Sequence, residues 1–124
     1  MCFYDLNCME AEEVTPAYLR KVAAGENVTV ARVEVNRGAI TQPHKHTNEE
    51  VIVVLKGAWC FRLADREVRL RPNQMLVIPA GVEHSSEALE DTVALDVCAG
   101  LRRDWISGED QGLHEDPDQF LWGV

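Results

Sequence analysis

Short runs of β-branched and aromatic residues, separated at nearly regular intervals by turn-forming residues, constrain this sequence most strongly. Glycine, proline, asparagine or aspartate lies between successive runs. Strands that recur every 8–12 residues or so are typical of antiparallel sandwiches and barrels. The sequence therefore predicts an all-β fold, and its 124 residues suit a single domain. The predicted strands are residues 28–35, 51–56, 58–63, 67–71, 75–79 and 92–98.

The predicted strands differ in how their apolar residues are arranged. In residues 59–63, apolar side chains alternate with others, as in a strand that is buried on one face. Residues 51–55 are apolar throughout, which predicts a strand buried on both faces. We expect a short helix at residues 15–20, because Pro16 suits the first turn of a helix.

Charge and hydropathy exclude several classes of partner. The chain has 12 basic and 21 acidic residues, a net charge of −9, whereas nucleic acids and anionic membrane surfaces attract basic proteins. No apolar run approaches the 20 residues, roughly, of a membrane-spanning helix. The acidic N-terminus lacks the basic and then apolar order of a secretory signal, so we expect a cytoplasmic protein.

Two short segments place histidines at spacings suited to a metal ion. His44 and His46 are two residues apart, so both imidazoles point to the same side of an extended chain, and Glu50 keeps that parity. A Pro-x-Gly turn at residues 79–81 brings His84 from a distant strand. Three imidazoles and one carboxylate suit one divalent first-row transition metal, with positions left for water or substrate. We therefore predict that these four residues bind Mn, Fe, Ni or Zn.

The same segments resemble the two motifs of the cupin superfamily. Residues 38–57 match the first motif, G-x5-HxH-x3-E-x6-G, at every defined position. Residues 73–88 resemble the second, G-x5-PxG-x2-H-x3-N, and depart from it at Asn73 and Ala88, neither of which is a predicted ligand. The resemblance covers residues 28–100 and implies a small double-stranded β-barrel, the cupin or jelly-roll fold, with the metal ligands in its mouth.

This resemblance divides the chain into three parts. Residues 1–27 supply N-terminal lead-in strands, residues 28–105 form the cupin barrel, and residues 106–124 form an acidic C-terminal tail. We expect an exposed tail, with His114 solvated and the apolar residues 120–122 holding the tail against the barrel.

The last predicted strand is similar to the end of the small pectin-degradation cupins of the KdgF type. Asp96 lies in an apolar frame, where a carboxylate costs free energy unless it is paired or used. Because side chains alternate between the two faces of a strand, the position of Asp96 would direct its side chain into the barrel. The alternatives are that it is exposed to solvent or that it pairs with Arg102. The resemblance implies that Asp96 is a catalytic acid/base and that Arg102 holds the substrate carboxylate. This chain departs from that family at Cys98, where an aromatic is usual, and at Glu50, where glutamine is usual.

Members of that family open the ring of 4,5-unsaturated uronates, so the resemblance implies a metal-dependent isomerase or tautomerase that acts on a small sugar acid. An Fe(II)-dependent dioxygenase is an alternative, because the same ligands can leave adjacent positions open for substrate and O2. A third reading is a non-catalytic cupin that binds a metal or small ligand. No glycine-rich phosphate loop indicates a nucleotide cofactor.

The N-terminal segment indicates a homodimer. Residues 1–27 contain more apolar side chains than lead-in strands of a small barrel require, among them Phe3, Tyr4 and Leu6. Unpaired edge strands are commonly covered by another chain. We therefore predict a homodimer in which a second copy covers this segment.

Overall fold

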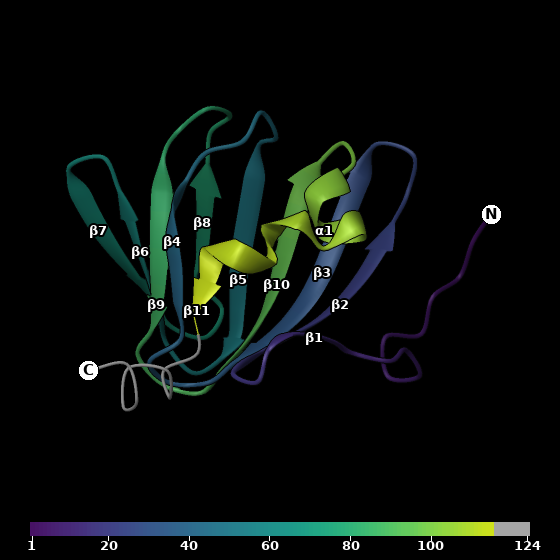
Figure 1. Ribbon diagram of the computed structural model, residues 1–124, viewed down its shortest axis with the longest axis horizontal. Helices are drawn as coiled ribbons and strands as arrows, with labels where there is room; N and C mark the ends of the chain where they lie inside the picture. The colour runs from purple at the N-terminus through teal and green to yellow at the C-terminus, as the bar shows by residue number, and fades with distance from the viewer. Residues whose placement is uncertain (116–124) are drawn as a thin grey trace.

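In the computed structural model, residues 1–115 are described, and their strands form two antiparallel sheets that face each other (Figure 1). In spatial order, the large sheet contains β1 (Glu12–Thr15), β2 (Tyr18–Ala24), β3 (Val28–Val35), β10 (Thr92–Ala99), β5 (Glu50–Lys56) and β8 (Met75–Ile78). The small sheet contains β11 (His114–Glu115), β4 (Ile40–His44), β9 (His84–Ala88), β6 (Trp59–Leu63) and β7 (Arg66–Leu70). The predicted all-β jelly-roll fold is confirmed.

The core lies between the two sheets, because every second residue of a strand points to that side. Ile52 and Val54 of β5 are fully buried, and Trp59 and Phe61 of β6 face them from the small sheet. The prediction that residues 51–55 are buried on both faces is wrong. No described element covers the outer face of the large sheet, and Leu55 is consequently 44% exposed.

The predicted helix at residues 15–20 is also wrong, because this segment contains a β-hairpin. Thr15 pairs with Tyr18, and Pro16 and Ala17 form the turn between β1 and β2. The fixed φ of proline suits the first central position of a turn as well as the first turn of a helix. The hydroxyl of Thr15 accepts a hydrogen bond from the Ala17 amide at 3.1 Å, which stabilises the turn.

Residues 103–115, which we call the C-terminal strap, run across the opening between the sheets (Figure 1). The strap contains helix α1 (Arg103–Ser107), the 3₁₀ helix η1 (Glu109–Leu113) and β11. Gly108 ends α1 with a left-handed φ of 79°, which favours glycine. No helix within residues 1–115 is both long and apolar enough to cross a membrane.

The strap is attached to the barrel by a buried ionic network. Arg20 of β2 is 1% exposed and donates hydrogen bonds to the carboxylates of Asp110 in η1 and Glu12 in β1. His114 lies 3.1 Å from Asp110 through Nε2 and 2.8 Å from the Thr41 hydroxyl through Nδ1. The expectation of an exposed tail with a solvated His114 is therefore wrong for these strap residues. Residues 120–122 lie outside the described part of the chain.

Candidate metal centre and the adjoining cavity

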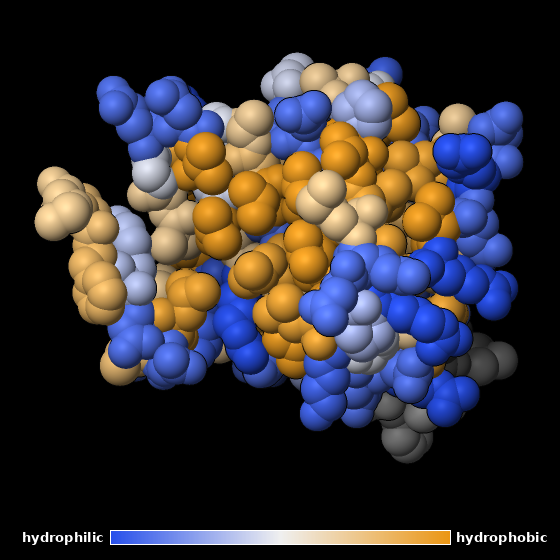
Figure 2. Space-filling view, turned by 180° about the vertical axis from the view of Figure 1, so that it is seen from behind, coloured by the Kyte–Doolittle hydropathy of each residue, from blue (hydrophilic) through white to orange (hydrophobic). Residues whose placement is uncertain are grey.

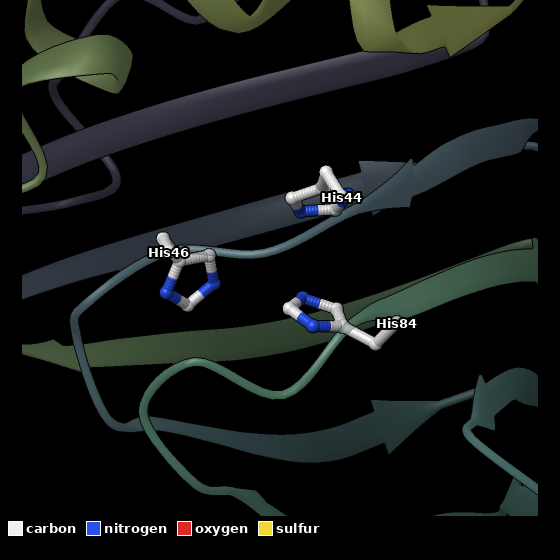
Figure 3. A group of neighbouring side chains, drawn as sticks. All are labelled: His44, His46 and His84. Atoms are coloured by element: carbon white, nitrogen blue, oxygen red, sulfur yellow. The ribbon is translucent and has the colours of Figure 1, made fainter.

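The three predicted histidine ligands lie together at one end of the small sheet, where their rings face one another (Figure 3). His44 ends β4 and pairs with His84, which begins β9, while His46 lies in the loop after β4. The ring centroids of His44 and His84 are 4.4 Å apart, and that of His46 is 5.0 Å from that of His84. Residues that are 40 positions apart in sequence thus meet through strand pairing.

Hydrogen bonds fix the orientation and tautomer of all three rings. Each ring directs Nδ1 toward a backbone carbonyl two residues away along the chain. Because a carbonyl only accepts, Nδ1 carries a proton and Nε2 faces the cluster. Nε2 of His46 and of His84 donates to Glu50 when the ring is protonated, and the neutral ring presents an Nε2 lone pair that can bind a metal ion. The carbonyls belong to Gln42, Asn48 and Val82, at 2.8, 2.9 and 2.9 Å respectively.

Glu50, at the start of β5, brings a carboxylate to the same point. It is 4% exposed, and its Oε1 lies 3.1 Å from Nε2 of His46 and 3.2 Å from Nε2 of His84. Burial opposes ionisation, but hydrogen bonds from Asp96 and the two histidines hold the pKa of Glu50 well below its ordinary value. A buried carboxylate among imidazoles requires a compensating cation.

These four side chains fit a divalent transition metal. Their inward donor atoms are imidazole nitrogens and one carboxylate oxygen, a set that suits first-row ions and is too soft for calcium. The backbone carbonyls beside each Nδ1 supply the outer contacts that hold metal-binding histidines in place.

Asp96 lies on β10 beside Glu50, with its side chain directed into the barrel. It is 5% exposed, and its Oδ1 has no hydrogen-bond partner among the described residues. Burial, together with the negative charge of Glu50, raises the pKa of Asp96 well above its ordinary value. Asp96 thus shares a hydrogen bond with Glu50 that favours the protonated form of Asp96, and it neither faces solvent nor pairs with Arg102.

Arg102 immediately precedes α1 and is 3% exposed. Its Nε and Nη2 donate to the Asp104 carboxylate at 2.8 and 2.7 Å, and its Nη1 donates to Sγ of Cys98 at 3.4 Å. The guanidinium also lies over the Trp105 ring, 4.3 Å from the centroid. It is thus a fixed positive charge that lines the same cavity as His44 and His84.

A cavity of about 30 Å³ joins these groups. This volume has room for about two water molecules, whereas pockets for small organic ligands usually hold roughly 300–1,000 Å³. His44, Asp96 and Arg102 line the cavity, and Trp105 and Leu113 of the strap cover it.

The structure thus brings together the predicted residues His44, His46, Glu50, His84 and Asp96, and Arg102 lines the same cavity. The sequence analysis did not identify the residues that contact Arg102 or attach the strap to the barrel, because these residues do not form a short motif. They are Arg20, Asp104, Trp105, Asp110 and His114.

Comparison with known proteins agrees with this geometry. The family model for the cupin domain matches residues 31–98, more than half of the chain, so the chain belongs to the cupin domain family. KdgF from Halomonas sp. is 28% identical in sequence, with a TM-score of 0.78 over 84% of this chain and 99% of that chain. A search of curated proteins found no match.

Two other solved structures share the fold. An RmlC-like cupin from Shewanella frigidimarina is 17% identical, with a TM-score of 0.77 over 83% of this chain and 94% of that chain. A structure concerned with the Mn(II) centres of Bacillus subtilis oxalate decarboxylase is 17% identical, with a TM-score of 0.69 over 84% of this chain and 33% of that chain. Cupins of this fold therefore include manganese proteins.

Proposed function

We propose that this chain is a metal-dependent cupin enzyme that opens the ring of a 4,5-unsaturated uronate and converts the resulting enol to the linear keto acid. The observation that carries the proposal is Asp96, a buried carboxyl whose Oδ1 lacks a partner on the wall of the cavity beside the histidines. The 28% identity with KdgF over 99% of that chain supports the same assignment.

The metal ligands in this proposal are His44, His46, Glu50 and His84. When bound, the ion would supply a Lewis acid that polarises an oxygen of the substrate. Glu50 also accepts the hydrogen bond of Asp96, which orients the Asp96 carboxyl toward the cavity. Asp96 then delivers a proton to the enol carbon and recovers one from the sugar hydroxyl as the ring opens, as general acid and base.

Arg102 holds the substrate carboxylate. Its guanidinium already binds a carboxylate, that of Asp104, through two parallel hydrogen bonds, and a uronate presents the same planar group. Substrate therefore takes the place of Asp104 as the strap moves away from the cavity.

The decisive experiment measures turnover of a 4,5-unsaturated monouronate from the fall in ultraviolet absorbance as its conjugated enol is consumed. Asp96→Asn should retain the fold and the metal but lose a factor of about 10²–10⁴ in turnover. Asp65→Asn, which changes an exposed turn carboxylate, is the matched control and should retain full activity. Arg102→Lys should mainly raise KM, because lysine keeps the charge but loses the planar pair of donors.

The other readings give different results with the same protein. An Fe(II) dioxygenase would consume O2, and a binding module would be stabilised by its ligand without turnover. If wild-type protein loaded in turn with Mn, Fe, Ni and Zn never accelerates ring opening over the spontaneous rate, the uronate assignment is wrong.

A further inference from the structure

Within residues 1–115, two buried side-chain polar atoms have no hydrogen-bond partner: Oδ1 of Asp96 and Nε1 of Trp59. Buried polar groups in folded proteins are nearly always paired, so each exception calls for an explanation. Asp96 and Trp59 both line the cavity under the strap. The proposed reaction uses the carboxyl of Asp96 and leaves the indole N–H of Trp59 without a role.

The sheet and the neighbouring rings hold Trp59 in place. Trp59 begins β6, which lies between β7 and β9, and its partner on β9 is Ala88. Ala88 is four residues beyond His84, so Trp59 lies farther along the sheet than the metal ligands. Trp59 is 2% exposed, and its ring centroid lies 4.8 Å from that of Phe61 and 6.4 Å from that of Tyr18. The indole is therefore preorganised for a ligand.

Packing alone does not explain an indole at this position. An N–H group that is buried without an acceptor destabilises a fold, whereas a phenyl ring fills a similar space without that cost. Phe61, two residues further along the same strand, lines the same cavity with a phenyl ring and is 4% exposed. The acceptor for the N–H of Trp59 is therefore expected to come from a ligand.

The chemistry of the cavity wall limits which acceptor can bind there. An indole N–H is a neutral group that only donates, so it suits a lone pair on a neutral oxygen. A second carboxylate on the ligand is unfavourable, because the acidic Glu50 and Asp110 also line the cavity. A hydroxyl group fits, and a 4,5-unsaturated uronate carries hydroxyls on C2 and C3 in addition to the carboxylate assigned to Arg102.

The side of the molecule away from the strap is less suited to such a ligand. Figure 2, which views the molecule from behind, shows hydrophobic residues gathered across the middle of that side. A polyhydroxylated acid exchanges its hydrogen bonds to water for few others on a hydrophobic surface, so binding there is unfavourable. The unpaired polar atoms that can recognise a hydroxyl lie instead between the sheets.

We propose that Trp59 determines substrate specificity by donating a hydrogen bond from Nε1 to a hydroxyl oxygen, on C2 or C3, of the uronate. For the class of substrate, this inference rests on the proposed function. Arg102, Asp96 and Trp59 then recognise three different parts of one small molecule. An acid that lacks the hydroxyl leaves the N–H of Trp59 unpaired and is rejected for that reason.

Calorimetric binding of ligands that do not react tests this inference without turnover. The ligands are a saturated hexuronate and its 2-deoxy and 3-deoxy forms, each added to the metal-loaded full chain. Wild type should bind the hexuronate about 10- to 100-fold more tightly than one of the deoxy forms, as expected when a buried donor loses its partner. Trp59→Phe, which removes the N–H and keeps an aromatic ring, should abolish this preference.

Phe61→Leu is the matched control, because it changes a neighbouring ring on the same strand and the same cavity wall that has no N–H. It should weaken binding of the hexuronate and of the deoxy forms by similar factors and so keep the preference. Trp59→benzothienylalanine, in which sulfur replaces the N–H in a ring of nearly the same shape, is a second variant with the same expected result as Trp59→Phe. Far-ultraviolet circular dichroism should show that every variant is folded.

A wild type that binds the hexuronate no more tightly than either deoxy form would overturn the inference. So would a preference that both Trp59 variants retain, because the N–H would then bind only a water molecule or serve the core. The proposed function is tested separately by ring opening. If the preference depends on Trp59 but no ring opening occurs, the hydroxyl site is supported and the reaction is wrong; ring opening without the preference gives the opposite result.

Discussion

Asp96 and Asp110 are both buried aspartates within one small fold, yet their surroundings are opposite. Asp110 receives hydrogen bonds from Arg20 and His114, which outweigh burial and hold the pKa of Asp110 well below its ordinary value. Asp96 lies beside the acidic Glu50 with one oxygen unpaired, and its pKa is raised well above the ordinary value. Because the residue type is the same, the surroundings decide the direction in which each pKa shifts.

The comparison separates two uses of buried charge. In the strap network, the Asp110 carboxylate pairs with the Arg20 guanidinium and the His114 imidazole. These contacts attach residues 103–115 to the barrel. In the histidine cluster, by contrast, the ring nitrogens of the three histidines lie close together, and Oδ1 of Asp96 has no hydrogen-bond partner among the described residues. We expect substitutions in the first cluster to affect stability and those in the second to affect ligand binding and turnover.

The largest effect on stability should come from Arg20→Met. The substitution leaves Asp110 buried without its main cation, and breaking a buried ion pair costs about 3–5 kcal/mol. Urea unfolding should report this loss, while metal content stays unchanged. Arg62→Met, which removes an exposed ion pair, should cost at most about 1 kcal/mol. Equal losses for the two variants would contradict a structural role for the strap network.

The second largest effect on stability should come from binding or removing the metal ion. A first-row ion at 100 times its dissociation constant should stabilise wild type by about 2.7 kcal/mol, and a chelator should remove that gain. His46→Ala should abolish both the gain and most of the bound metal measured by elemental analysis. His114→Gln changes a histidine of the strap network and should keep the metal. Retention of metal by His46→Ala would show that the histidine cluster is not the binding site.

Acid should weaken the strap network. The folded pKa of Asp110 lies below its unfolded value of about 3.9, so its stabilisation is present above that pH and is lost as pH falls through the folded pKa. Asp110→Asn should cost about 1.5–3 kcal/mol at pH 7, the usual contribution of hydrogen bonds to a charged group, and should flatten the acid limb of the stability curve. Urea midpoints measured from pH 7 to pH 2 provide the test; an acid limb that is the same in both proteins would argue against this assignment.

The smallest effect on stability is expected for Asp96→Asn. An amide has nearly the shape of a protonated carboxyl and can donate the same hydrogen bond to Glu50, so unfolding free energy should change by no more than about 0.5–1 kcal/mol. Urea unfolding of the metal-loaded protein checks this expectation. A loss as large as that of Arg20→Met would mean that Asp96 serves the fold, and its effect on turnover could not then be assigned to chemistry.

Local spacing in the sequence accounts for the metal cluster. His44 ends β4, Glu50 begins β5, and the short loop between them carries His46. The Pro-x-Gly turn places His84 in register with His44, so the motif spacing predicted that these residues converge. The strap network could not be predicted in this way. Arg20 and Asp110 are 90 residues apart, and nothing in an acidic, turn-rich segment indicates which carboxylate will be buried.

The error at residues 51–55 has a similar origin. An uninterrupted apolar strand can be covered on its second face either by the same chain or by another one, and a single sequence does not distinguish the two. The structure shows that the described chain leaves Val51 and Val53 half-buried and Leu55 exposed on that side.

The strap also has a kinetic consequence. Because the cavity under the strap measures about 30 Å³, a uronate of the proposed reaction would enter only as often as the strap opens, and its apparent dissociation constant would be the intrinsic one divided by the open fraction. Each ion pair that secures Asp110 lowers that fraction. A substitution that weakens this attachment, such as one at Arg20, should therefore lower the free energy of unfolding and raise the rate of substrate binding.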